Sequence, residues 1–280
     1  MPNSEYTRSG HREVSTLVER QNVQNERSRN AAQSAGGSHF KRHGFTLLDV
    51  LTSLAVITVL VSLTLPTLSK VRETTHRVVC SAHIRELLIG TEQWARDHKD
   101  ELPPSEFAPK SGDQNFQPER MQTLRRGMPD SGWDGLGNLW QHDYGVSVAS
   151  YYCPAHAGQH PMSRYVNAFT VGGTSEIIGN YHMRGFTGGN ANLNRMNNRL
   201  ALITDGLSSQ VDFNHRVGGN VGRLDWSVAW YNDPSGEIVK RLPGNVGDAM
   251  ARDQVELAWR QLDSVTAPLT SLSTQTNGPW

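Results

Sequence analysis

One uncharged apolar run constrains what this chain can fold into more than any other feature. From Val50 to Ser69 no side chain is charged, and most residues are Leu, Val, Ile or Ala. A helix from Phe45 to Leu65 would be roughly 30 Å long at about 1.5 Å per residue, which matches the hydrocarbon core of a bilayer. A core helix of a soluble domain is the alternative, but such helices are usually amphipathic, and this run is apolar on every face. We therefore expect a transmembrane helix over residues 45–65.

The residues that precede this run indicate how it is processed and oriented. A secretory signal has about 7–15 apolar residues followed by small residues at its cleavage site. Here the small residue, Gly44, comes before the apolar run, directly after Lys41, Arg42 and His43. A cut after Gly44 would therefore leave the whole helix on the mature protein. The excess of Lys and Arg before the helix predicts that this end stays in the cytoplasm.

The residues Lys-Arg-His-Gly-Phe-Thr-Leu-Leu-Asp at 41–49 resemble the prepilin-type processing motif of type IV pilins and type II secretion pseudopilins. The resemblance implies that a prepilin peptidase cuts after Gly44 and methylates Phe45. It also implies an assembly role for Asp49, which would pair with the N-terminal amine of a neighbouring subunit. The family usually has Glu at that position, and solvation of Asp49 at headgroup level is the alternative. Pro66 lies where many family members also have a proline, and it would kink the helix.

Composition divides the rest of the chain into segments. Residues 1–44 are polar and should form a disordered cytoplasmic leader that is removed by cleavage. Residues 66–99 carry apolar side chains at three- and four-residue spacing, so they should continue the helix as an amphipathic half. The 26 glycines and 13 prolines favour a loop-rich β domain over residues 100–263 outside the cytoplasm. Residues 264–280 should form a tail.

These segments together predict an α+β, pilin-like fold, in which the long N-terminal helix packs on an antiparallel sheet. A helix near residues 247–262 should end the domain. The predicted strands are residues 150–153, 164–170, 177–183, 200–205, 210–213 and 221–230. The segment from His215 to Val228 also resembles the His…Asn…Asp-Gly segment of many large bacterial pseudopilin-like proteins. Trp226 replaces the usual glycine after Asp225, which disfavours a tight turn because Trp tolerates a positive φ poorly.

The two cysteines can be interpreted in three ways. Outside the cytoplasm Cys80 and Cys153 would be oxidised, and a bridge between them would join the long helix to the sheet. We expect this bridge, and two separate buried thiols are the alternative. A metal site is the third interpretation, since Cys153, His156 and His160 have a Cys-x2-His-x3-His spacing of the kind that zinc ligands show. The prolines in this stretch make it a loop, and with eleven histidines in the chain clusters arise by chance.

Calcium is a further metal to consider, but the chain lacks a loop of alternating carboxylates closed by a Glu. Isolated aspartates that could supply oxygen ligands are Asp205, Asp225, Asp233 and Asp248. We expect no resident cofactor.

The remaining observations limit the function. Lys plus Arg and Asp plus Glu both number 27, so net charge gives no reason to expect a nucleic-acid partner. The chain has no Gly-x-Ser-x-Gly elbow, Walker loop, His-Glu-x-x-His or dinucleotide fingerprint, and we expect no enzyme.

We expect a structural pseudopilin of the bacterial inner membrane, with its domain in the periplasm and prepilin peptidase as its processing partner. Its N-terminal helix would assemble with other pilin or pseudopilin subunits into a type II secretion pseudopilus or type IV pilus-like filament, in the service of protein transport. The alternative is a single-pass anchored protein whose outer domain binds a ligand or polysaccharide and never assembles.

Overall fold

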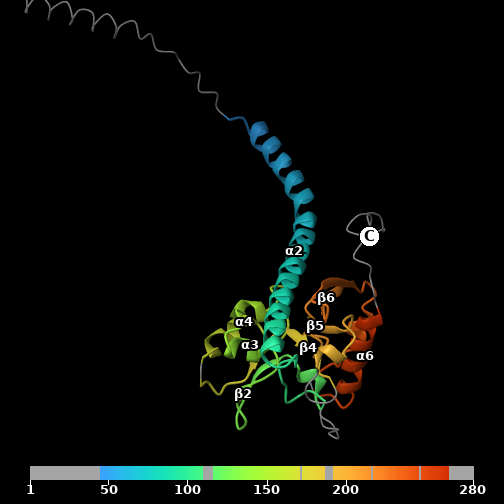
Figure 1. The fold of residues 1–280 in the computed structure, drawn as a ribbon. Coiled ribbons are helices and arrows are strands. Elements are labelled where there is room, and N and C mark those ends of the chain that lie inside the picture. The colour runs from blue at the N-terminus through green and yellow to red at the C-terminus, as the bar shows by residue number, and fades with distance from the viewer. Residues whose placement is uncertain are drawn as a thin grey trace, which may run out of the picture. The chain divides into compact units, whose positions relative to one another are not determined.

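The computed structural model describes residues 45–109, 116–170, 172–186, 192–215, 217–245 and 247–264 (Figure 1). The predicted leader, including the cleavage residue Gly44, and residues 265–280 of the predicted tail lie outside the described residues. The described residues fall into two units, one that ends at Ser62 and one that begins at Leu63. The fold is α+β, with a long N-terminal helix and two antiparallel sheets.

Helix α2 (Leu47–Asp97) contains both the predicted span and most of its predicted amphipathic continuation. Pro66 lies within it. The helix ends where Lys99 and Asp100 adopt positive φ angles of 57° and 63°, ahead of the two prolines that follow Leu102. In the first unit, every side chain from Phe45 to Ser62 is exposed. Among the described residues, α2 is the one helix long and apolar enough to cross a membrane.

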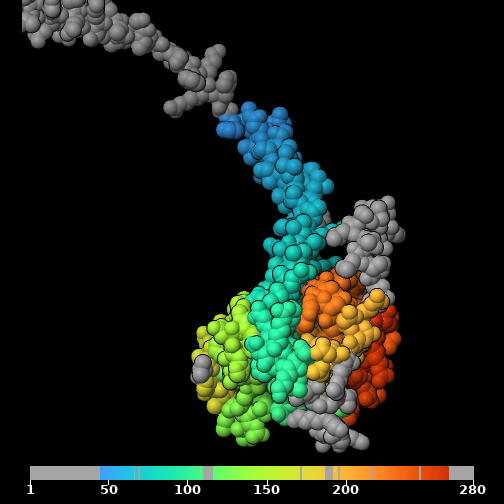
Figure 2. Space-filling view, in the orientation of Figure 1, coloured from blue at the N-terminus to red at the C-terminus, as the bar shows by residue number. Residues whose placement is uncertain are grey.

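In the second unit, α2 carries a buried stripe that packs on the larger sheet. Cys80, Ile84 and Leu87 are each 0% exposed, at the three- and four-residue spacing of one helix face. The hairpin formed by β6 (Gly218–Arg223) and β7 (Val228–Asn232) lies beside the teal part of α2 in Figure 2. A Cβ atom added to Gly222 of β6 would lie 2.8 Å from side-chain atoms of both Ile84 and Leu88. The glycine therefore lets the helix approach the sheet closely.

The larger sheet has four antiparallel strands in sequence order: β4 (Tyr181–Met183), β5 (Ala201–Asp205), β6 (Gly218–Arg223) and β7 (Val228–Asn232). Its register pairs Thr204 of β5 with Val221 of β6, and Val221 with Ala229 of β7. Helix α6 (Ala251–Ser264) packs on this sheet through a second core that contains Val221 and Trp259. The sheet therefore lies between α2 and α6, as Figure 1 shows.

A smaller antiparallel sheet has the strand order β2 (Gly132–Trp133), β1 (Thr123–Arg126), β3 (Ile177–Ile178). Its residues Leu124 and Ile177 join the core on the α2 side of the molecule, together with Tyr151 and Tyr181. The remaining described helices are short: η1 (Pro118–Arg120), α3 (Gly137–Gln141), η2 (Val148–Tyr151), α4 (Met162–Tyr165), η3 (Val166–Ala168), η4 (Leu193–Arg195) and α5 (Glu237–Arg241).

Several predicted strands are wrong because local hydrogen bonds close turns there. Residues 150–153 begin inside η2, where the Ser147 side chain accepts from the Ser150 N–H. Residues 164–170 fall in α4 and η3, which Pro161 introduces. Residues 210–213 form a turn instead. Residues 177–183 divide into β3 and β4, which belong to different sheets.

The predicted strand over residues 221–230 is a hairpin, formed by the end of β6, a turn and the start of β7. The turn closes because the Arg223 N–H donates to the Ser227 carbonyl over 2.9 Å and the Trp226 N–H donates to the Arg223 carbonyl over 3.0 Å. Trp226 occupies the left-handed region with a φ of 64°. Asp225 supports the turn by accepting from the Ser227 N–H. The turn therefore forms with Trp in the position where the resemblance led us to expect glycine.

Candidate functional site

The N-terminal end of α2 is closed by reciprocal hydrogen bonds between Thr46 and Asp49. Asp49 Oδ2 accepts from the Thr46 backbone N–H over 2.9 Å and from the Thr46 hydroxyl over 2.8 Å. Thr46 Oγ1 accepts from the Asp49 N–H over 3.2 Å. This pattern is a capping box with Asp in the third helical position. Asp49 thus has a local role in starting the helix that our sequence analysis missed, although the Thr-x-x-Asp spacing signals it.

The apolar part of α2 satisfies its hydroxyl groups within the helix. The hydroxyls of Thr52, Ser53, Thr58 and Ser62 each donate to the backbone carbonyl three residues earlier. A hydroxyl without a partner is costly in hydrocarbon, so internal hydrogen bonds of this kind suit a lipid environment. The four residues therefore do not weaken the prediction of a membrane span.

A disulfide joins Cys80 of α2 to Cys153, which follows η2, so the structure pairs the two cysteines as the sequence analysis predicted. Their Cα atoms lie 5.4 Å apart, and the side chains are 0% and 4% exposed. The bond links the long helix covalently to a loop that packs on the sheet. Because both sulfurs are buried, an external thiolate has no access to them without local opening.

Asp205, the last residue of β5, lies beside this disulfide and is 0% exposed. Its Oδ1 accepts from Asn214 Nδ2 over 2.9 Å, and its Oδ2 accepts from the Asn220 N–H over 2.6 Å. Burial raises the pKa of Asp205, while the facing charge of His215 and these hydrogen bonds act in the opposite direction. A buried carboxylate held by several donors has a fixed orientation.

His215 completes a buried group of four side chains. Its Nε2 lies 3.7 Å from Cys153 Sγ and 3.9 Å from Asp205 Oδ1, and its Nδ1 lies 3.1 Å from Glu73 Oε1 on α2. One ligand atom from each of Cys80, Cys153, Asp205 and His215 lies within 4.8 Å of all the others. We call these four residues the Cys–His–Asp cluster. It is the one group of this kind in the part of the chain that the structure describes.

The weak candidate zinc ligands His156 and His160 do not form a site with Cys153. His156 and His160 instead lie near Asp212, with His156 Nε2 3.8 Å and His160 Nε2 3.9 Å from its carboxylate oxygens. His156 Nδ1 is 2.8 Å from Asn214 Oδ1, and His160 Nδ1 is 2.8 Å from the Tyr165 hydroxyl. The spacing was misleading because the loop directs both imidazoles toward Asp212 while the thiol of Cys153 is bonded to α2.

The four aspartates considered for calcium do not converge either. Asp225 closes the β6–β7 turn and Asp205 belongs to the Cys–His–Asp cluster. Asp233 accepts from the first backbone N–H groups of α5, and Asp248 accepts from the Asn245 N–H. Each of these carboxylates therefore has a structural partner of its own.

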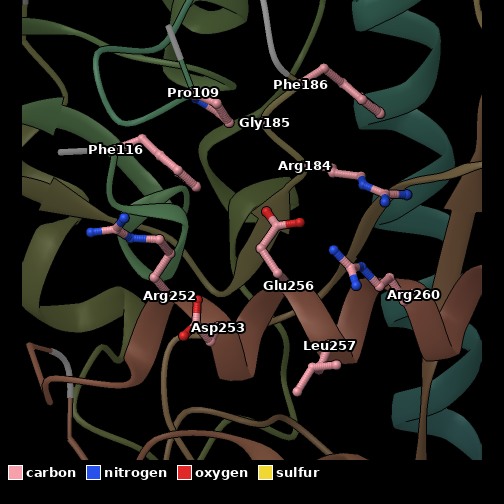
Figure 3. Close-up of a pocket in the computed structure, with 10 residues that line it drawn as sticks. All are labelled: Pro109, Phe116, Arg184, Gly185, Phe186, Arg252, Asp253, Glu256, Leu257 and Arg260. Atoms are coloured by element: carbon pink, nitrogen blue, oxygen red, sulfur yellow. The ribbon is translucent and has the colours of Figure 1, made fainter. Parts of the chain in front are cut away.

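A surface pocket of about 530 Å³ lies where α6 meets the residues that follow β4. In Figure 3 the Glu256 side chain points into it, with Arg184 and Arg260 on one side and Arg252 on the other. Arg184 is bound to Asp263 through contacts of 2.9 and 2.7 Å. Burial raises the pKa of Glu256, and the positive charges of Arg184 and Arg260 act to lower it. A pocket of this size with basic and aromatic walls could hold a small polar ligand.

Neither a protein-family model, nor a curated protein, nor a solved structure matches this chain.

Proposed function

We propose that this chain is a pilin-like structural subunit, anchored in a bacterial inner membrane and assembled through its N-terminal helix into a pseudopilus or type IV pilus-like filament. The observation that carries the proposal is the combination within α2 of an exposed, uncharged apolar half and an amphipathic half whose buried stripe packs on an antiparallel sheet. Helices of a filament core can bury the first half against one another, while the second half supports the folded domain.

The residues at the start of α2 support the same proposal. Gly44 precedes Phe45, which is 90% exposed and would become the new N-terminus. The Asp49 carboxylate lies one turn into the helix, and its hydrogen bonds to Thr46 all use Oδ2. Oδ1 makes no hydrogen bond to any residue that the structure describes, so it could face a neighbouring amine. Capping and subunit pairing are therefore compatible roles for one carboxylate.

The basic residues before the helix support an orientation with the N-terminus in the cytoplasm and the domain in the periplasm. The disulfide supports the same orientation, because such bonds form and persist in oxidising compartments.

The first experiment determines the intact mass and N-terminal residue of the protein extracted from membranes of cells with an active prepilin peptidase. The proposal predicts an N-methylated Phe45 in the wild-type chain and an uncut chain in the Gly44→Ala variant. A wild-type protein that keeps residues 1–44 under these conditions would exclude prepilin processing.

Assembly is tested with two matched variants of Asp49. Asp49→Asn keeps an oxygen that can accept from the Thr46 N–H but removes the negative charge. Asp49→Glu keeps the charge and restores the residue that is usual in pilins. We expect cross-linked filaments from the wild type and from Asp49→Glu, and a loss of filaments in Asp49→Asn. Equal assembly of all three would show that the carboxylate does not pair subunits.

The pocket beside α6 favours a second candidate, a membrane-anchored protein whose domain binds an anionic or saccharide ligand and does not assemble. Its guanidinium groups suit carboxylate or phosphate groups, and two of them, those of Arg252 and Arg184, lie over the Phe116 and Phe186 rings. Processing at Gly44 together with dependence on Asp49 distinguishes the filament subunit from this candidate. An uncut protein that binds acidic oligosaccharides, and loses them in an Arg252→Ala variant, would favour the second.

A further inference from the structure

The buried Cys–His–Asp cluster has the composition of a zinc site as well as that of a disulfide with polar neighbours. We propose that the dithiol form of this protein binds one Zn²⁺ through the two sulfurs, the imidazole Nε2 and one carboxylate oxygen of the cluster. The disulfide and the zinc complex are then two alternative states of one site. The proposal concerns the folded domain and does not depend on processing or assembly of the N-terminal helix.

The distances within the cluster suit tetrahedral coordination with little movement. Zinc bonds of about 2.3 Å to sulfur, about 2.0–2.1 Å to nitrogen and about 2.0–2.2 Å to oxygen place a sulfur and a nitrogen roughly 3.6 Å apart, and a nitrogen and an oxygen roughly 3.4 Å apart, in a tetrahedron. Cys153 Sγ and His215 Nε2 are 3.7 Å apart, and His215 Nε2 and Asp205 Oδ1 are 3.9 Å apart. The main movement required is the separation of the two sulfurs to about 3.8 Å, which reduction of their bond permits.

The surroundings of the ligands resemble a supporting shell for a metal. Metal-binding histidines generally direct their second nitrogen to a carboxylate or carbonyl, which fixes the ring and leaves a lone pair for the metal. Glu73 Oε1, 3.1 Å from His215 Nδ1, has this position. If Nδ1–H donates to Glu73, Nε2 carries its lone pair toward the sulfurs. Asp205 is likewise oriented by donors from Asn214 and Asn220.

The chemistry of the donor set selects the metal and the kind of site. Two thiolates and an imidazole favour zinc over calcium or magnesium, which prefer oxygen ligands. Four protein ligands close the coordination sphere, as in structural rather than catalytic zinc sites. The burial of both cysteines argues against a thiol-exchange catalyst, because such cysteines must be reached by a partner. We therefore infer a structural site.

The two states differ by a defined reaction. A phosphine reductant breaks the S–S bond with two electrons, takes the oxygen of a water molecule to become a phosphine oxide, and leaves two thiols. Zn²⁺ then displaces the two thiol protons as the Zn–S bonds form. In either state, Cys80 of α2 and Cys153 remain joined, by a covalent bond or through the metal. A chain that has not yet been oxidised could thus keep the same tertiary connection.

The test uses the full chain in detergent micelles, reduced with a phosphine in metal-free buffer and titrated with Co²⁺ alone, then with Zn²⁺. The proposal predicts one bound Co²⁺ per chain, with tetrahedral ligand-field bands and thiolate-to-cobalt charge transfer, and stoichiometric displacement by Zn²⁺. The oxidised chain should show neither signal, because its sulfurs are bonded to each other.

Two pairs of variants assign the ligands and the supporting carboxylate. His215→Ala should abolish the cobalt spectrum, whereas His160→Ala, which changes a histidine outside the cluster, should leave it unchanged. Glu73→Ala should weaken Zn²⁺ binding by about 10–100-fold. Glu92→Ala is its matched control, because Glu92 forms the same i, i+4 pair with an arginine on α2 and should not affect binding.

A reduced chain that keeps its native circular dichroism and binds no Co²⁺ or Zn²⁺ would overturn the proposal. So would a reduced chain that unfolds and is not refolded by Zn²⁺. If His215→Ala does not fold, Glu73→Ala decides, since Glu73 is partly exposed. Binding that Glu73→Ala leaves intact and His160→Ala removes would assign the metal to another site and refute the ligand set.

Discussion

Removal of the disulfide should cost this protein a large part of its stability. The change is the double substitution of Cys80 and Cys153 by alanine. Alanine is preferable to serine here because a hydroxyl at these buried positions would need a hydrogen-bond partner. The measurement is thermal unfolding of the full chain in detergent, with a chelator present so that metal binding contributes nothing.

The expected magnitude follows from the loop that the bond closes. The cysteines are separated by 73 residues, and a closed loop of that length lowers the entropy of the unfolded chain enough to stabilise the fold by about 4.4 kcal/mol at 25 °C. Measured values for disulfides are typically about 2–4 kcal/mol. At about 2–4 °C per kcal/mol for a domain of this size, a loss of about 4 kcal/mol lowers Tm by roughly 8–16 °C.

The control is the wild-type chain with a phosphine reductant and the same chelator, which should lose a similar amount. The alanine variant itself should not respond to the reductant. A double variant that melts within about 2 °C of the wild type would refute the reasoning, because it would show that the long loop is already restrained in the unfolded chain.

Three further predictions concern single positions in the folded domain, each measured by denaturant or thermal unfolding. Gly222→Ala places a methyl group against α2 and should lower the free energy of unfolding by about 1–3 kcal/mol. Gly127→Ala is the control, and it should change stability little because its Cβ would meet its nearest atom at 3.4 Å. Equal losses in the two variants would contradict the close packing of β6 on α2. Asp233→Ala removes the acceptor for two N–H groups of α5 and should cost about 1–2 kcal/mol, and a loss below about 0.3 kcal/mol would argue against capping. Burial lowers the pKa of His182 to about 4, whereas the ordinary pKa of a histidine is 6.5. As the pH falls below 6.5, the unfolded chain therefore binds a proton that the folded chain does not, and the free energy of unfolding should decrease by up to about 3 kcal/mol by pH 4. A His182→Gln variant that keeps the same pH dependence would assign this loss of stability to other groups.

The elements that the sequence predicted well are those with long or strong periodicity. The uncharged run and its amphipathic continuation correspond to α2, which ends at Asp97 rather than at residue 99. The predicted terminal helix at 247–262 corresponds to α6 at Ala251–Ser264, and the predicted strand at 200–205 corresponds to β5. Short apolar runs were less informative, because a pattern over four residues does not distinguish a strand from a helical turn such as η2 or α4.

The candidate site was predictable only in part. Cys80 and Cys153 could be paired from their number and the expected compartment. Asp205 and His215 could not be placed beside them, because they are brought there by the pairing of β5 with β6 and by the turn between them. The contact of His215 with Glu73 joins residues 142 positions apart. Local spacing offered only His156 and His160 as weak candidates, and the fold directs both of them toward Asp212.

The place where the disulfide meets α2 has a mechanical consequence. A tensile load applied along the uncharged half of the helix would first meet the noncovalent contacts of Glu73 and Arg77 with the domain, and at Cys80 it would pass by a covalent route to Cys153. The helix could then not be peeled from the sheet starting at its exposed end without shearing the packed stripe that follows Cys80. With the bond removed, the same load would act on noncovalent contacts one turn at a time, and the domain should detach at a lower force.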